Sequence, residues 1–179
     1  MADQLSAKDW LDQGLRTLAK SGFTALKAEP LAKTMGVSRG SFYWHFADIA
    51  AFHAAILDHW RDVAVEQIIT EVEAVSPDQN ALPALLRRVF GIKPPLLESA
   101  MRSWAAHDPA ARSTVQAVDQ RRLGYVENQL RASGLSAEAA RGRAQILYWA
   151  FLGFALSGKP LPRAKQATVL DELLRMASR

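Results

Sequence analysis

The sequence predicts an all-α protein of about nine helices, and three observations support this fold class. Apolar residues recur at the three- and four-residue spacing of a helix face, whereas the alternation expected of a half-buried strand is nearly absent. Turn-forming pairs that contain glycine or proline separate these periodic segments. The composition, 49% apolar and 22% charged, is that of a globular chain that can bury a core.

The chain contains no cysteine, so disulfides, thiolate metal sites and cysteine nucleophiles are excluded. A chain without disulfides fits a reducing compartment, and its first residues lack the charged and apolar regions of a signal peptide. We therefore expect a cytoplasmic protein.

Two short helices open the chain. A capping box formed by Ser6 and Asp9 begins the first helix, and Gly22 provides its left-handed end. The second helix is expected over residues 28–35, and Gly36 ends it. A third short helix follows the glycine turn.

Ser38 is positioned to cap that third helix, which is expected over residues 39–46. Phe42 and Phe46 are four residues apart and therefore share a face of it.

Longer helices follow. Asp48 caps a fourth helix, whose apolar stripe continues to about Val75. The remaining helices are expected over residues 81–90, 96–106, 110–132, 137–157 and 164–177. Turn residues separate them at 76–80, Pro94-Pro95, Asp108-Pro109, Ser133-Gly134 and 158–162. Because no repeat or flexible linker is present, the domain boundary is expected near residue 47, which gives domains 1–47 and 48–179.

Residues 31–46 have the pattern of a helix-turn-helix, in which a short helix, a glycine-containing turn and a second short helix follow one another. The apolar residues of this segment can close a small core with the first helix. The side chains that then face outward are those of Arg39, Ser41, Tyr43, Trp44 and His45. Exposed Tyr and Trp gain no burial energy, so this set favours a reader of the DNA major groove.

Each of these side chains has a matching group on DNA. Arg39 can reach O6 and N7 of guanine, and Tyr43 can meet a thymine methyl group or a phosphate. Ser41 and His45 can donate hydrogen bonds to phosphates. The net charge of +4 permits a polyanionic partner but does not by itself indicate one.

Four short stretches resemble the N-terminal domain of the TetR family of bacterial transcriptional repressors: Gly22-Phe23, Leu26–Ala32, Gly36–Ser38 and Ser41–Phe46. The resemblance covers about residues 9–57. It implies a homodimer that binds a palindromic double-stranded DNA operator and releases it when a small-molecule effector occupies the C-terminal domain. By position it assigns DNA contacts to Lys27, Arg39, Gly40, Ser41, Tyr43, Trp44 and His45. The family commonly has a lysine after the cap at Asp48, whereas Ile49 stands here, so the resemblance does not carry that phosphate contact over to this chain.

Several alternatives remain open at this stage. Residues 39–46 also suit an amphipathic helix of an ordinary bundle, and a small helical enzyme or ligand carrier with a C-terminal cavity is a rival function. Gly36–Gly40 fits the G-x-S-x-G nucleophile pattern, but no strand precedes Ser38. Gly153–Pro160 approaches a phosphate loop, but proline stands where a hydroxyl must hold magnesium. The histidines lack metal-binding spacing. We expect no catalysis, cofactor or metal.

Residues 144–158 carry no charge, yet this stretch is shorter than the ~20 residues that cross a bilayer. Its apolar side chains lie all round the helix, so it needs cover on every side. A second subunit supplies that cover, and a buried helix in a monomer is the alternative. The expected dimer interface, a four-helix arrangement of the last two helices of each subunit, includes Tyr148, Ala150, Phe151, Gly153, Phe154, Ser157, Leu170, Leu173 and Leu174.

The sequence also predicts an effector pocket in the C-terminal part of the chain. In the resembling family, helices four to seven surround the effector cavity, and on them this chain carries Trp60, Phe90, Met101, Trp104, Arg122 and Tyr125. A pocket of this type suits an aromatic or lipophilic effector. Plain core packing is the alternative for most of these residues. Arg122 lies within an apolar stripe and needs a partner, which is Asp119, Glu98 or an anionic group of the ligand.

Overall fold

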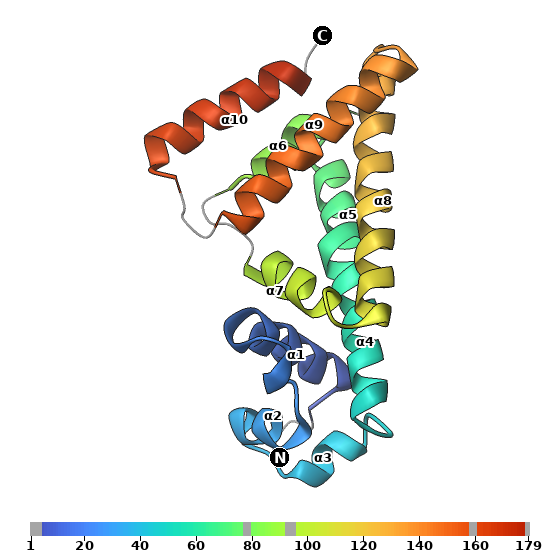
Figure 1. The fold of residues 1–179 in the computed structure, drawn as a ribbon, viewed down its shortest axis with the longest axis vertical. Coiled ribbons are helices and arrows are strands. Elements are labelled where there is room, and N and C mark those ends of the chain that lie inside the picture. Colours follow the sequence, from blue (N-terminus) through green and yellow to red (C-terminus); the bar gives the residue numbers. More distant parts are fainter. Residues whose placement is uncertain (1–4, 77–79, 92–95, 158–160, 178–179) are drawn as a thin grey trace. The chain divides into compact units, whose positions relative to one another are not determined.

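The computed structural model describes residues 5–76, 80–91, 96–157 and 161–177 (Figure 1). Every regular element within these ranges is helical, which confirms the predicted all-α class. The α-helices are α1 (Ala7–Ser21), α2 (Ala28–Met35), α3 (Arg39–Tyr43), α4 (Ile49–Arg61), α5 (Gln67–Ala74), α6 (Leu82–Val89), α7 (Leu96–Ala105), α8 (Pro109–Ala132), α9 (Ala137–Leu156) and α10 (Arg163–Ala177).

Two further helical segments complete the chain order. A 3-10 turn, η1 (Phe23–Ala25), follows α1, and a π-helical segment, η2 (Asp62–Glu66), lies directly between α4 and α5. The predicted fourth helix therefore corresponds to α4, η2 and α5 in succession. The predicted turns at residues 77–79, Pro94-Pro95 and 158–160 lie outside the described residues.

The predicted ends at Ser6, Gly22, Gly36 and Asp48 are confirmed by hydrogen bonds and backbone angles, whereas the Ser38 side chain makes no capping hydrogen bond to α3. The Ser6 backbone N–H donates to the Asp9 carboxylate over 2.7 Å, and the Asp9 N–H donates back to the Ser6 hydroxyl over 3.3 Å. Gly22 and Gly36 have φ angles of 77° and 71°, which side chains with a Cβ rarely adopt. Asp48 caps α4 by accepting from the Ala51 N–H over 2.7 Å.

The third helix is shorter than predicted, because α3 ends at Tyr43 and the expected continuation to Phe46 is wrong. The N–H groups of His45 and Phe46 both donate to the Phe42 carbonyl, each over 3.1 Å. These two bonds close the last turn and leave the chain free to reach the extended cap residue Asp48.

The chain forms two compact units. The first contains residues 1–62 and 96–116, and the second contains residues 63–95 and 117–179. In the first unit, α4 and α7 both pack on α1, so these helices belong with the short N-terminal ones. The packing units therefore differ from the predicted domains, which divide the chain by role at residue 47.

The core of the first unit is aromatic. The rings of Trp10, Phe46 and Phe52 surround Phe42 at centroid distances of 5.4, 5.2 and 5.2 Å, mostly in edge-to-face geometry. Trp10, Phe42 and Phe52 have no exposed surface. This cluster joins α1, α3 and α4 into one body.

The second unit has an aliphatic core formed by α6, α8, α9 and α10. Its buried members are Leu82, Leu86, Phe90, Val126, Leu130, Ala140, Ala144, Leu147, Leu173 and Ala177. Phe90 also packs against the rings of Phe151 and Phe154, at 6.4 and 5.5 Å. Elsewhere in this unit, Tyr125 on α8 is buried beside Glu73 of α5, and burial together with that carboxylate raises the pKa of Tyr125 to about 12.

None of the helices in the described ranges is both long and apolar enough to span a membrane. Among the same residues, no group of histidines and carboxylates is arranged to hold a metal ion.

The first prediction concerns Gly14, where α1 approaches α4. A Cβ placed on Gly14 would lie 2.3 Å from Ile56 Cδ1 and 2.9 Å from Phe52 Cζ. We expect Gly14→Ala to lower the free energy of unfolding by about 1–3 kcal/mol, because the core must shift to admit the methyl group. Urea unfolding followed by circular dichroism measures this change.

Gly124→Ala is the matched control, because a Cβ there would meet no described atom within 4 Å. Gly124 lies inside α8, so alanine should raise stability by about 0.5–1 kcal/mol through helix propensity. A stabilising effect of both substitutions would contradict close packing at Gly14.

The second prediction follows from the pKa of Tyr125. Above pH 10 an unfolded tyrosine loses its proton, whereas Tyr125 in the folded chain keeps its proton up to about pH 12. The stability linked to this group is therefore fully present below pH 10 and is lost as the pH rises through the folded pKa. Between pH 10 and 12 we expect the free energy of unfolding to fall less for Tyr125→Phe than for the unsubstituted protein. Urea unfolding across that pH range measures both. Equal losses in the two proteins would show that Tyr125 titrates normally.

Candidate nucleic-acid interface

The helix-turn-helix is built on a tightly closed turn. The Val37 N–H donates to the Ala32 carbonyl over 3.0 Å, and the Gly36 N–H donates to the Lys33 carbonyl over 3.3 Å. This pattern ends α2 on a left-handed glycine. Leu31 and Ala32 on α2 are buried, as is Phe42 on α3, so the two helices share one core.

Burial of Phe42 leaves the remaining side chains of α3 on or near the surface. Arg39 and Gly40 are exposed, and Ser41 and His45 are partly buried. Tyr43 is 46% exposed and Trp44 is 85% exposed. Trp44 and His45 lie in the turn that follows α3 and not on the helix itself.

Arg39 and Tyr43 contact each other along α3. The Arg39 Nη2 donates a hydrogen bond to the Tyr43 hydroxyl over 3.0 Å. The guanidinium carbon lies 5.5 Å from the centre of the tyrosine ring, within cation–π range. The two side chains therefore form one polar and aromatic pair on the surface.

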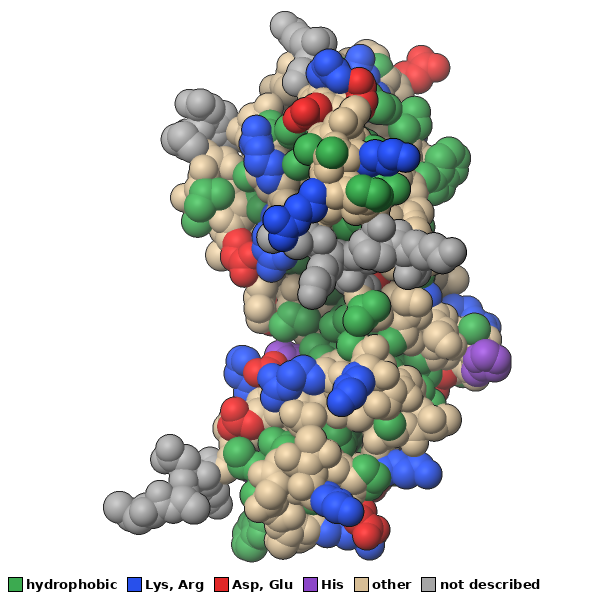
Figure 2. Space-filling view, turned by 90° about the vertical axis from the view of Figure 1, so that its left-hand side faces the viewer, with side chains coloured by type: hydrophobic (Ala, Val, Ile, Leu, Met, Phe, Trp, Pro, Cys, Tyr) green, Lys and Arg blue, Asp and Glu red, His purple; other side chains and the backbone are tan. Residues whose placement is uncertain are grey.

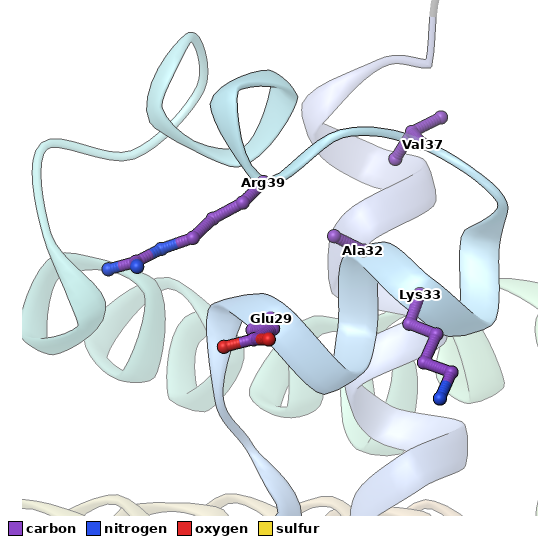
Figure 3. Close-up of a pocket in the computed structure, with 5 residues that line it drawn as sticks. All are labelled: Glu29, Ala32, Lys33, Val37 and Arg39. Carbon is purple, nitrogen blue, oxygen red and sulfur yellow. The ribbon is translucent and has the colours of Figure 1, made fainter.

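A groove of about 440 Å³ runs beside this pair, lined by Glu29, Ala32, Lys33, Val37 and Arg39. Figure 3 shows that the side chains of Glu29 and Arg39 extend toward the same side of the groove, whereas Lys33 points the other way. The groove thus carries both signs of charge. It is not a uniformly basic channel.

Two positions bear on the contacts to the DNA backbone that the sequence analysis expects. Lys27 is exposed at the residue before α2, where its backbone carbonyl accepts the Leu31 N–H over 3.2 Å. Ile49 begins α4 and is 37% exposed, so an apolar side chain occupies the position where the resembling family commonly has lysine. On the face drawn in Figure 2, Lys and Arg side chains are interspersed with acidic ones. Attraction for a polyanion therefore depends on local placement of charge.

The six predicted effector-pocket residues fall in different units. Trp60, Met101 and Trp104 belong to the first unit, and Phe90, Arg122 and Tyr125 belong to the second. All except Arg122 are buried. Trp104, for example, stacks on Phe23 at a centroid distance of 4.5 Å. The structure thus gives five of these residues a place in core packing.

Arg122 lies in a polar and aromatic cluster of the second unit. Its Nη2 donates to the Ala64 carbonyl over 3.3 Å, and its guanidinium lies 5.2 Å from the centre of the Phe151 ring. In the same unit, the Tyr148 hydroxyl donates to Asp119. Glu98, one of the expected partners, instead pairs with Arg102 over 2.8 Å in the first unit.

The predicted dimer residues differ in exposure. Tyr148 and Leu173 are buried, and Gly153 and Ser157 are exposed. The other five, Ala150, Phe151, Phe154, Leu170 and Leu174, are partly buried and pack against the aliphatic core of the second unit.

Of the exposed face of α9, sequence reasoning placed only Gly153 in the expected interface. Ile146, Trp149 and Leu156 are 46%, 63% and 48% exposed and share this face with Gly142 and Gly153. A Cβ on either glycine would have open space within 4 Å. The signal was present in the sequence, because these five residues recur at alternating spacings of four and three. We call Gly142, Ile146, Trp149, Gly153 and Leu156 the α9 face.

The comparisons with known proteins agree with this geometry. Residues 11–56 match the family model of the bacterial regulatory proteins of the tetR family. A search of curated protein sequences found no significant match.

Solved structures share the fold over almost the whole chain. The structure of E. coli NemR in its reduced form is 20% identical, covers 96% of this chain and 94% of its own, and has a TM-score of 0.74. A transcriptional regulator from Rhodococcus sp. Rha1 is 22% identical, covers 97% and 96%, and has a TM-score of 0.75. The multidrug binding protein EbrR, solved in complex with imidazole, is 20% identical, covers 96% of each chain and has a TM-score of 0.59.

At these identities the structural likeness shows a shared fold, and the family assignment rests on the N-terminal match. Residues 11–56 are therefore similar to the N-terminal part of the bacterial regulatory proteins of the tetR family.

Proposed function

We propose that this regulator is a ligand-responsive transcriptional repressor that binds a palindromic DNA operator as a homodimer. The observation that carries the proposal is the orientation of α3. Phe42 is fully buried, while Arg39, Tyr43 and Trp44 stand on the surface of a closed helix-turn-helix. An arginine and a tyrosine on α3, with a tryptophan in the turn that follows it, supply groups for base edges and for the sugar-phosphate backbone.

DNA binding by such a protein is a geometric problem. Two copies of α3 must lie about one helical turn of DNA apart, roughly 34–36 Å or a multiple of it, to enter successive major grooves. An effector that favours another spacing lowers the affinity for the operator. Because bacterial DNA lies in the cytoplasm, this proposal also places the protein there. It assigns the chain no catalytic role.

The α9 face supports the proposed homodimer. An exposed strip with Trp149 and Ile146 at its centre is an unfavourable surface for a monomer in water. Gly142 and Gly153 lack side chains on the same face, so a partner helix can approach closely. A second copy of this helix offers a matching strip, because a two-fold interface uses the same patch on both subunits.

The effector is proposed to be a small aromatic or lipophilic molecule that binds in the C-terminal part of the chain. The described cluster around Arg122 supports this choice, since the partly buried Phe151 ring lies beside the Arg122 guanidinium. EbrR, which shares the fold, was solved with imidazole, a small aromatic base.

The third prediction separates base contacts from phosphate contacts. We expect Arg39→Ala to weaken binding to a selected operator by about 1–3 kcal/mol and to relax the preference at one base pair, because a bidentate contact is lost. Lys27→Ala should weaken binding to specific and random duplexes alike, because it removes a charge near phosphates. Mobility-shift titrations at about 150 mM salt, with both duplexes, measure the two effects. Equal losses on both duplexes for both variants would contradict the assignment.

The fourth prediction tests the α9 face. Replacing Trp149 with glutamate places a charge in the centre of the proposed interface, so we expect Trp149→Glu to shift the protein toward monomer and to weaken operator binding. Sedimentation equilibrium gives the oligomeric state.

Val75→Glu is the matched control, because Val75 is 70% exposed and lies at the end of α5, away from α9 in sequence. It should leave the oligomeric state unchanged. A Trp149→Glu protein that remains a dimer would show that the α9 face is not the interface.

A further inference from the structure

The contact between Arg39 and Tyr43 has a structural origin on α3. The two residues are four apart and so share a face of the helix. The Tyr43 ring is itself held, because it packs edge-on against Phe42 at a centroid distance of 5.3 Å. Phe42 has no exposed surface. A line of contacts therefore runs from the buried core through Tyr43 to the exposed guanidinium of Arg39.

From this line of contacts we propose that Tyr43 is a positioning residue, whose hydroxyl holds the Arg39 guanidinium in place to read a guanine base. The inference rests on the proposed function of α3 and names the base that it reads. It differs from the expectation that Tyr43 acts by its own contact with a thymine methyl group or a phosphate.

The chemistry of the guanidinium permits both contacts at once. Arg39 carries five N–H donors, and the hydrogen bond to Tyr43 uses only one of them, on Nη2. The remaining donors are enough for the two acceptors, O6 and N7, that guanine presents in the major groove. An exposed arginine that is free in solution loses side-chain conformational entropy when it binds a base. An arginine that is already held by another residue loses less of this entropy.

The Glu29 carboxylate adds a second reason for base reading. It lines the same groove as Arg39 and extends toward the same side (Figure 3). The hydrogen bond to Tyr43 and the nearby carboxylate of Glu29 both keep the pKa of Arg39 above its usual value. A negative charge near Arg39 weakens its long-range attraction for phosphates. Directional hydrogen bonds to a base edge are affected less, so Arg39 is better suited to a base than to the backbone.

A double-mutant cycle tests the positioning role. The probe is the tightest duplex that the unsubstituted protein selects from a pool of randomised duplexes, with a random duplex as reference. Binding is measured by fluorescence anisotropy for the unsubstituted protein, Tyr43→Phe, Arg39→Ala and the double variant. Phenylalanine keeps the ring at a position that is 46% exposed and removes only the hydroxyl, so the fold should be retained.

We expect Tyr43→Phe to weaken binding to the selected duplex by about three- to ten-fold, the range for loss of one hydrogen bond. In the Arg39→Ala background the same substitution should cost nothing further, because Tyr43 acts through Arg39. Replacement of one G·C pair in the selected duplex should leave the affinity of Arg39→Ala unchanged. The same replacement should lower the affinity of Tyr43→Phe by less than it lowers that of the unsubstituted protein. Arg87→Ala, which removes an exposed arginine of α6, controls for charge alone and should leave the base preference unchanged.

The outcomes separate this inference from the proposed function. If no duplex is enriched by the unsubstituted protein, both are overturned. If a duplex is enriched but Tyr43→Phe costs the same in both backgrounds, Tyr43 contacts DNA independently and only the positioning role is overturned. Dependence on an A·T pair at the position read by Arg39 would also overturn it.

Discussion

The burial of Phe42 is the constraint on which the proposed DNA-facing surface depends. α3 has only five residues, too few to be stable as an isolated helix, so tertiary contacts must hold it. Full burial of a phenylalanine side chain contributes about 1.5–3 kcal/mol, and its ring fixes the rotation of the helix about its axis. With that rotation fixed, the side chains of Arg39 and Tyr43 lie on the surface. The same ring then supports Tyr43, so one buried group both anchors the helix and orders what the helix presents.

A second set of contacts stabilises the π-helical segment η2, which follows α4 without a break. π-helical turns are rare and often occur at functional sites, since they disturb the regular hydrogen-bond ladder. Two arginines of α8 contact this segment. Arg121 pairs with Glu66 through two hydrogen bonds of 3.0 Å, and Arg122 donates to the Ala64 carbonyl. Arg122 also lies over the Phe151 ring, so its side chain contacts both that ring and the backbone of η2.

Much of the fold was predictable because its signals are local in sequence. The capping box at Ser6, the left-handed glycine at position 36 and the cap at Asp48 each depend on a few neighbouring residues, and all three appear in the structure. The end of α3 was not predictable in this way. The periodicity that joins Phe42 to Phe46 persists through the turn, because both rings enter the same core although the helix has already ended. Likewise, the two packing units depend on where α7 docks, and helical periodicity gives no information about that.

The candidate sites show a related limit, which is physical. Apolar periodicity identifies a helix face that avoids water, but it cannot say whether the cover comes from the same chain or from another. On α9 the large side chains around Leu147 meet the core of their own unit, while Trp149, two residues later, remains exposed. Of the small residues Ala150, Gly153 and Ser157 in the predicted interface, only Gly153 belongs to the α9 face. The Arg39–Tyr43 pair had a sequence signal, since arginine and tyrosine lie four residues apart on a helix. What the sequence lacked was the orientation of Tyr43 against Phe42, which determines that the hydroxyl meets the guanidinium. Candidate binding positions can thus be predicted from residue type and spacing, whereas the contacts that would orient their side chains depend on packing.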